Sequence, residues 1–341
     1  MAEIKNRQWL LAARPHGLIR ESDFRWNETT VAPLKDGEVL VRNLAFSFDP
    51  TQRGWMSMDT YMPAIPLGRV MLAGAVGQVV ESRRPGFSKG DLVQGLFGWE
   101  DYTVTAGEGL MGLRKLPSGT EPLLALSLLG TTGLTAYFGT LTVGQPKAGD
   151  TFVVSGAAGA TGSVAGMIAK IKGCRVVGIA GGREKCEWLT REAGFDAAID
   201  YKNESVGEAL KRHCPKGIDV YFDNVGGEIL DLVLARLADG ARVVLCGAIS
   251  RYSDPSGVFG PGPKNYFNLI FHGARMEGFL VFRFARQFPE AIAELSKWHA
   301  EGKIINRIDL QHGLENAPNT LARLFTGANF GKQLLKLADP D

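Results

Sequence analysis

The sequence predicts an α/β protein in which a compact β domain precedes a doubly wound parallel sheet. Between residues 39 and 116, short apolar runs such as VLVRNLAF are separated by Pro, Gly and Asp without a sustained helical period, which is typical of a β domain. From residue 149 onward, apolar runs alternate with segments of helix length. This alternation indicates right-handed βαβ units and a parallel sheet covered on both faces. The length, 341 residues, also exceeds the ~250–300 residues that one hydrophobic core supports.

The elements after residue 149 follow in order along the chain. Apolar runs predict strands at residues 151–155, 175–180, 197–201, 218–225 and 241–248. Helical periodicity predicts helices at residues 163–173 and 184–194 and a longer helix around 291–301. The tail from residue 308 to 337 has strand-like ends and is too short to fold alone, so we expect it to complete one of the two domains.

Composition and charge point to a globular protein with a small-molecule partner. Hydrophobic residues make up 45% and charged residues 22% of the chain, which excludes wholesale disorder. The 38 Lys and Arg residues nearly balance the 36 Asp and Glu residues, without a long run of one sign. A dedicated surface for nucleic acid or for an anionic membrane is therefore not expected.

The cysteines and the longest uncharged segment bear on location. Four cysteines occur without CxxC pairs or a secretory segment, which favours a reducing, cytoplasmic setting. Residues 122–146 carry no charge and are long enough to span a bilayer. Pro, Ser, Thr and Gly interrupt this segment repeatedly, so it is predicted to form a buried helix and loop.

The strongest local motif is SGAAGATG at residues 155–162, between a predicted strand and a predicted helix. Its glycines permit a sharp turn and let the backbone approach a pyrophosphate, which the first amides of the helix can hold. The spacing GxxGxxG departs from the usual GxGxxG, and such turns are often purely structural. The strand before and the helix after the motif favour nucleotide binding.

The end of the next strand indicates which dinucleotide is bound. An NAD site usually has Asp or Glu there, on the ribose 2′-hydroxyl. This chain instead has Gly181 and Gly182, followed by Arg183 and Lys185, which can offer positive charge to a 2′-phosphate. NADP is therefore predicted over NAD. The alternative is that both cations are solvated residues of a first helical turn, where the helix dipole disfavours them.

Other catalytic chemistries find no support in the sequence. A zinc site needs three or four converging ligands, yet the N-terminal domain has no cysteine and only His16, and the other histidines are scattered. No metal is therefore expected. Motifs for covalent catalysis are lacking, and Cys246 is read as a strand residue rather than a nucleophile. The aromatic run at residues 265–271 is either core or the wall of a substrate site, and core is favoured.

Taken together, the motifs resemble a known family. The segments SGAAGATGSVAG, CRVVGIAGGREK, FDAAIDYK, GIDVYFDNVGGE, CGAISRY and FTGANFGKQLLK resemble the zinc-independent medium-chain reductases, and the likeness extends over essentially the whole chain. Within them the sequence is most similar to the NADP-dependent alkenal double-bond reductases, which include prostaglandin reductase, leukotriene hydroxydehydrogenase and curcumin reductases.

The resemblance implies a domain organisation and a set of cofactor contacts. It implies a GroES-like β domain at residues 1–125, a Rossmann NADP-binding domain at 126–307, and a return to the first domain at 308–341. The cofactor contacts it implies are Gly159, Ala160, Thr161 and Gly162 at the pyrophosphate, Lys185 and Tyr201 at the 2′-phosphate and adenosine, then Asn224, Cys246, Gly247, Ala248, Ile249, Ser250, Tyr252, Phe279, Leu280, Val281 and Asn329.

The expected substrate residues include departures from the family pattern. Relatives usually have a tyrosine after Asp-Pro, in DPYMRG, where this chain has Thr51, and some have a tyrosine where it has Phe271. Together with Tyr61, these are the expected substrate contacts. The pocket is expected to be wider or more polar near Thr51.

The implied activity is NADPH-dependent reduction of a C=C bond conjugated to a carbonyl, by a cytoplasmic homodimer. Hydride delivery to the β carbon creates enolate charge, which a hydroxyl stabilises. Tyr252 and the nicotinamide ribose are the candidate donors, and either solvent or Tyr252 supplies the α-carbon proton. Tyr252 alternatively only packs on the cofactor. A quinone oxidoreductase of the same fold and an inactive nucleotide-binding regulatory protein remain as rival functions.

Overall fold

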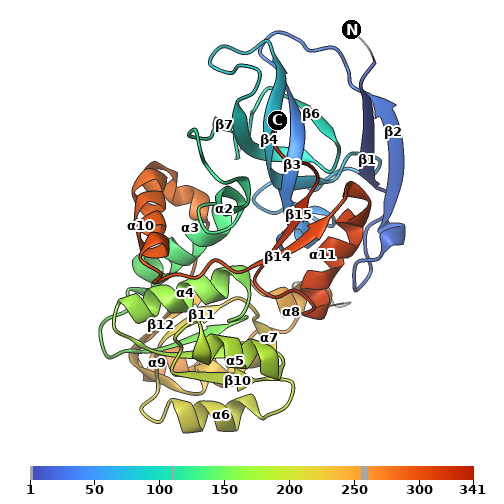
Figure 1. Cartoon of the computed structure of the whole chain (residues 1–341). Helices are drawn as coiled ribbons and strands as arrows, with labels where there is room; N and C mark the ends of the chain where they lie inside the picture. Colours follow the sequence, from blue (N-terminus) through green and yellow to red (C-terminus); the bar gives the residue numbers. More distant parts are fainter. Residues whose placement is uncertain (1–2, 110, 255–259) are drawn as a thin grey trace. The chain divides into compact units, whose positions relative to one another are not determined.

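The computed structural model describes residues 3–109, 111–254 and 260–341 (Figure 1). The chain divides into two units, each of which gathers more than one segment. Unit 1 consists of Met1–Leu126, Ile308–Asn329 and Gln333–Asp341, and unit 2 of Ser127–Arg307 and Phe330–Lys332. The domain boundaries expected after residues 125 and 307 stay predictions about independently folding domains.

Unit 1 is built mainly of antiparallel β structure. In the described residues, a seven-stranded sheet has the order β14-β15-β3-β4-β5-β7, with β6 paired to β3, and β1 and β2 form a separate hairpin. The strands are β1 (Lys5–Leu11), β2 (Phe24–Thr30), β3 (Val39–Ser47), β4 (Leu72–Ser82), β5 (Leu92–Gly98), β6 (Tyr102–Thr105), β7 (Arg114–Lys115), β14 (Ile308–His312) and β15 (Lys332–Lys336). The short helices are η1 (Glu21–Asp23), α1 (Gln52–Trp55), α2 (Pro122–Leu126) and η4 (Leu314–Asn316), and α11 spans Ala317–Thr326.

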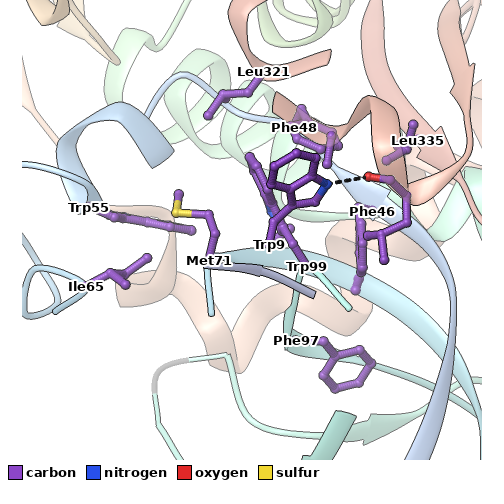
Figure 2. Packing of buried hydrophobic residues seen from close by; sticks show 14 of the residues in the cluster. Trp9, Phe46, Phe48, Trp55, Ile65, Met71, Phe97, Trp99, Leu321 and Leu335 are labelled. Carbon is purple, nitrogen blue, oxygen red and sulfur yellow. Dashed lines mark hydrogen bonds between the residues drawn. The ribbon is translucent and has the colours of Figure 1, made fainter. Parts of the chain in front are cut away.

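The main core of unit 1 joins residues from both ends of the chain. Figure 2 shows Leu321 of α11 and Leu335 of β15 in the same cluster as Trp9 and Phe48. The Trp9 indole N–H donates a hydrogen bond to the Leu314 carbonyl, at 2.9 Å (Figure 2). The C-terminal segment therefore completes the core of unit 1, because its apolar side chains are buried there.

Unit 2 contains the predicted parallel sheet. Over the described residues, six strands lie in the order β10-β9-β8-β11-β12-β13, and every neighbouring pair is parallel. They are β8 (Thr151–Ser155), β9 (Arg175–Ala180), β10 (Ala197–Asp200), β11 (Ile218–Asp223), β12 (Leu237–Leu245) and β13 (Arg275–Gly278). Numbered along the chain, this is the order 3-2-1-4-5-6 of a Rossmann fold. The predicted α/β class, with a doubly wound sheet, is confirmed.

Helices cover both faces of this sheet (Figure 1). Helices α6 (Val206–His213) and α7 (Gly227–Leu234) pack on the face that presents Val153, Tyr221 and Val243. Helices α4 (Ala160–Ile171) and α5 (Arg183–Arg191) lie on the other face, where Gly178 of β9 approaches Phe195 and Leu189. The remaining helices of unit 2 are α3 (Thr131–Phe138), η2 (Gly139–Gly144), α8 (Ile249–Tyr252), α9 (Asn268–Phe271), η3 (Val281–Gln287) and α10 (Phe288–Ala300).

Two expectations about apolar segments had different outcomes. The uncharged segment forms α2, α3 and η2, as the prediction of buried helix and loop required. Among residues 3–109, 111–254 and 260–341, no helix has both the length and the apolarity that a membrane crossing needs. The preference for core at residues 265–271 was wrong, because Tyr266, Phe267, Ile270 and Phe271 are each about half exposed or more. Among the described residues of one chain, no element covers these four side chains.

Two glycines of unit 2 give a matched test of packing. A methyl group at Gly166 in α4 would overlap the Phe195 ring, whereas one at Gly207 in α6 would meet Leu232 at an ordinary 3.4 Å. We expect Gly166→Ala to destabilise the protein by about 1–3 kcal/mol through overpacking. Gly207→Ala should stabilise it by about 0.4–1 kcal/mol, because alanine restricts the unfolded chain. Scanning calorimetry should show melting shifts of opposite sign, and equal shifts would contradict this account of α4.

Candidate functional site

The predicted cofactor residues of unit 2 meet at one edge of its sheet. Each group lies in the segment that comes after one strand: residues 159–162 after β8, Lys185 after β9, Tyr201 after β10, Asn224 after β11, residues 246–252 after β12 and 279–281 after β13. Since all six strands are parallel, these segments share the carboxyl edge. Ligands of such sheets bind at this edge, where the strand order reverses between β8 and β11.

The glycine-rich turn after β8 has a geometry that side chains would block. Gly156 adopts φ +60°, a conformation that glycine tolerates without strain. A methyl group at Gly162 would overlap the Gly156 carbonyl, so the start of α4 packs closely against the turn. The N–H groups of the first turn of a helix have no partner within the helix, and in α4 they belong to Ala160, Thr161 and Gly162. The turn therefore fits a pyrophosphate.

The end of β9 has the open backbone that the sequence indicated. Gly182 has φ +99° and precedes α5, and its N–H donates to Asp200 Oδ1 at 2.8 Å. The Tyr201 ring lies over Gly181, where a methyl group would come 2.8 Å from it.

The two cations after β9 differ in their surroundings. Arg183 Nε pairs with Glu187 Oε1 at 2.6 Å, and 88% of the Arg183 side chain is exposed. Lys185 lies in the first turn of α5 and is half-buried. Both cations are candidate ligands of a 2′-phosphate, and Glu187 would compete with the phosphate for Arg183.

Sequence reasoning missed Asp223, the last residue of β11, which organises the centre of this edge. The residue is 1% exposed. Its Oδ1 accepts hydrogen bonds from Ser155 Oγ (3.0 Å), Tyr221 Oη (2.8 Å), and the N–H groups of Val225 (3.0 Å) and Gly226 (2.9 Å). Burial raises the pKa of this carboxyl. An acid that ends the apolar run IDVYFD was the signal available in the sequence.

Asp223 also connects the neighbouring strand ends. Its carbonyl accepts the N–H groups of Cys246 (2.9 Å) and Gly247 (3.0 Å), just beyond β12. Asn224 donates from its backbone N–H to Ser155 Oγ (3.0 Å) and from Nδ2 to the Ser155 carbonyl (2.8 Å). The ends of β8, β11 and β12 are thus fixed to one another by hydrogen bonds.

Tyr252 ends α8, and its side chain folds back towards β12. Its hydroxyl oxygen accepts a hydrogen bond from the Ala248 N–H at 3.3 Å. Within the described residues, no group accepts the Tyr252 proton. Burial raises the pKa of this phenol, so it stays neutral and able to donate at neutral pH.

The other predicted cofactor residues at this edge differ in their surroundings. Burial raises the pKa of the Cys246 thiol to about 12, which makes it a poor nucleophile. The Phe279 ring lies against Gly139, where a methyl group would come 2.6 Å from it. Leu280 is 38% exposed, whereas Val281 is buried.

The remaining predicted residues lie elsewhere. In unit 1, Thr51 Oγ1 and the Tyr61 hydroxyl are 3.0 Å apart, and Trp55 Nε1 donates to Tyr61 at 3.2 Å. Two predicted substrate residues are therefore neighbours. Asn329 also belongs to unit 1. Phe271 ends α9 shortly before β13 begins, at the amino end of that strand, so unit 2 does not bring it to the carboxyl edge.

Metal ligands do not converge in the described part of the chain. Among residues 3–109, 111–254 and 260–341, no group of three or more His, Cys, Asp or Glu side chains is arranged to hold a metal ion. The prediction that zinc is not used stays a prediction.

The fold and site define a class, the dinucleotide-dependent oxidoreductases with a Rossmann unit and a β unit. Residues 7–113 match a family described as the N-terminal domain of oxidoreductase, and residues 160–297 match one described as zinc-binding dehydrogenase.

Individual relatives narrow this class. The NADPH-dependent curcumin reductase of Escherichia coli K12 is 42% identical over 341 residues, 99% of this chain and 98% of that protein. The NADP-dependent 2-alkenal reductase of Nicotiana tabacum is 39% identical, over 98% of each chain. CurA from Vibrio vulnificus, solved in complex with NADPH, superposes with a TM-score of 0.91 at 42% identity, covering 98% of this chain and 100% of that one. This chain therefore belongs to the medium-chain dehydrogenase/reductase family, in the group of NADP-dependent double-bond reductases.

Proposed function

We propose that the protein uses NADPH to reduce the C=C bond of α,β-unsaturated ketones and aldehydes. The observation that carries this proposal is the neutral Tyr252 hydroxyl, positioned by the Ala248 N–H at the carboxyl edge of the Rossmann sheet. A hydroxyl at that position can donate a hydrogen bond to the carbonyl oxygen of the substrate. That oxygen gains negative charge when hydride is added to the β carbon. The similarity to an NADPH-dependent curcumin reductase and to an NADP-dependent 2-alkenal reductase supports the same chemistry.

When bound, NADPH supplies the hydride, and the chain binds and orients both reactants. The first amides of α4, with Gly159, Ala160, Thr161 and Gly162, hold the pyrophosphate, while Lys185 and Tyr201 hold the 2′-phosphate and adenosine. Asn224, Cys246, Gly247, Ala248, Ile249, Ser250, Phe279, Leu280, Val281 and Asn329 are the further proposed cofactor contacts.

Tyr252 acts on the substrate rather than on the cofactor. Its oxygen already accepts from the backbone, so its own proton is directed to the substrate carbonyl oxygen. That hydrogen bond strengthens as negative charge develops there, which lowers the barrier to hydride addition. Thr51 and Tyr61 are proposed to line the substrate pocket.

The activity itself is the first test. NADPH oxidation should depend on an enone or enal and yield the saturated carbonyl product. Because no step uses a metal, excess EDTA should leave the rate unchanged. A steady-state preference for quinones would favour the rival quinone oxidoreductase. Nucleotide binding without turnover of either substrate would favour a regulatory protein.

Cofactor choice is tested at α5. Lys185→Ala should weaken NADPH binding by about 10- to 150-fold, because a charge-assisted contact to the 2′-phosphate contributes about 1.5–3 kcal/mol. NADH binding should change little, since it lacks that phosphate. Arg183→Ala is the matched control, because it removes a neighbouring cation whose side chain is 88% exposed. Dissociation constants for both nucleotides measure the effect, and equal losses for the two would refute the assignment.

The role of Tyr252 is tested by removing its hydroxyl. Tyr252→Phe should lower kcat by about 10- to 1,000-fold, as loss of an oxyanion donor does, while NADPH affinity stays near that of the parent. Activity needs the protonated phenol, so it should fall only as pH rises through the Tyr252 pKa. Burial raises that pKa, and the fall should therefore lie above about pH 10. Equal single-turnover rates for parent and variant would reduce Tyr252 to a packing residue.

We also propose a cytoplasmic homodimer. Four of the eight large, exposed hydrophobic side chains of the described residues fall between residues 266 and 271. They shortly precede β13, the last strand in the sheet order. Apolar patches beside an edge strand are typical of interfaces, and Phe271 would serve that contact. All four cysteines are free thiols, which suits a reducing compartment.

The oligomeric state is checked by light scattering. The parent should have the mass of a dimer, and Ile270→Glu should shift it towards the monomer by placing charge in the interface. Leu67→Glu is the control, because Leu67 is comparably exposed in unit 1. A monomeric parent would overturn the proposal.

A further inference from the structure

Three residues of the C-terminal segment do not belong to unit 1. Residues 308–329 and 333–341 are part of unit 1, whereas Phe330–Lys332 belongs to unit 2. Figure 1 shows β15, which starts within this short segment, near the C-terminal end of the chain. These three residues, from near the C-terminus, therefore pack with the Rossmann unit.

The segment is fixed beside the glycine-rich turn. The Gly331 N–H donates to the Ala158 carbonyl at 3.0 Å, and Gly331 forms a parallel bridge with Gly159. Ala158 and Gly159 directly precede α4, whose first amides are proposed to hold the pyrophosphate. One of the peptide groups of that turn is thus oriented by residue 331.

The same segment contacts the second phosphate-binding element. The Phe330 ring lies edge-on to Trp188 of α5, with centroids 5.5 Å apart. The Arg307 guanidinium lies over both rings, 3.7 Å from the Phe330 centroid and 5.6 Å from that of Trp188. Since α5 begins two residues before Lys185, this stack fixes the helix that carries the proposed 2′-phosphate ligand.

The backbone around Gly331 tolerates only glycine. Its φ is +87°, where other residues are strained. A methyl group would also overlap the Arg307 carbonyl, which itself accepts the Lys332 N–H at 2.8 Å. Because the obstructing atom is backbone, the segment must move if Gly331 is replaced.

We propose that Phe330 and Gly331 are positioning residues for the dinucleotide. Their contacts to the pyrophosphate turn and to α5, which we call the brace, hold these two elements in one fixed geometry. The proposal rests on the proposed function for the identity of the nucleotide. Neither residue needs to touch the nucleotide. The gain is preorganisation, because a turn already held in the binding geometry loses less entropy when the phosphates bind.

Gly331→Ala tests the contact to the turn. Losing the bond to Ala158 should raise the Kd for NADPH about 3- to 10-fold. The kcat at saturating NADPH should stay within about twofold, as expected when ground-state binding alone is lost. Gly302→Ala is the matched control, since Gly302 has φ +70° but nothing within 4 Å of an added methyl group. A Kd equal to that of the control would overturn the proposal.

Phe330 variants test the stack on α5 and serve if Gly331→Ala does not fold. Phe330→Leu keeps apolar volume but removes the ring beneath Arg307, and it should raise the Kd about 3- to 10-fold. Phe330→Tyr should retain the parent value. Amide exchange in the nucleotide-free protein should speed up at Gly159 and Ser163, whose N–H groups are hydrogen-bonded, for Gly331→Ala, and in residues 186–191 for Phe330→Leu.

The measurements on the Gly331 and Phe330 variants test the brace independently of the proposed catalytic function. If the parent fails to reduce enones, the proposed function falls, yet nucleotide affinity and amide exchange still report on the brace. Unchanged affinity in both Gly331→Ala and Phe330→Leu would refute the brace while leaving the catalytic proposal intact.

Discussion

The carboxylate of Asp223 is the interaction on which the proposed cofactor site depends. Four donors converge on a single oxygen of a side chain that is 1% exposed. In the described part of the structure its other oxygen, Oδ2, is buried without a partner. Burying a charge is costly unless hydrogen bonds offset the lost solvation, and the cost is visible as a raised pKa. In return, the ends of β8, β11 and β12 are joined. Replacement by an apolar side chain would leave four donors, most of them buried, without this acceptor, so the residue cannot be exchanged without rebuilding the edge.

Because the ends of β8, β11 and β12 are fixed, the segments that follow these strands begin at fixed positions. The glycine-rich turn leaves β8, Asn224 follows β11, and the segment that leads to Tyr252 leaves β12. In a parallel sheet these exits share one edge although they are far apart in sequence. The short helix α8 then turns the Tyr252 side chain back to the Ala248 N–H. Tyr252 therefore depends on Asp223 indirectly, because Asp223 fixes the backbone of Cys246 and Gly247 from which that short helix departs.

The sequence predicted the parts of the fold whose physics is local. Buried parallel strands are continuous apolar runs, so β8, β9 and β11 could be recognised from composition alone. Strand β13, with Arg275 and Glu277, has no such run, and it was not predicted. Helix α11 was also missed, because its buried face is completed by Trp9 and other residues some 300 positions away.

The exposure of Phe271 was misjudged for a related reason, since apolarity does not reveal whether a neighbour is available to cover it. The glycine turn and Lys185 were found from spacing, whereas the brace at Gly331 required the three-dimensional path of the chain.

The pair Thr51 and Tyr61 shows how a departure from the family pattern acquires a physical meaning. Trp55 Nε1 can only donate, so the Tyr61 oxygen must accept from it. The 3.0 Å contact with Thr51 then has two solutions, in which either hydroxyl donates to the other. A tyrosine at position 51 would place an aromatic ring where this chain has a small hydroxyl side chain. Threonine at that position therefore exchanges apolar area for a polar contact that orients Tyr61. If this pair lines the substrate pocket, it favours substrates with a polar group opposite the hydroxyls over purely aliphatic ones, because an aliphatic chain would leave those hydroxyls with fewer hydrogen bonds than water provides.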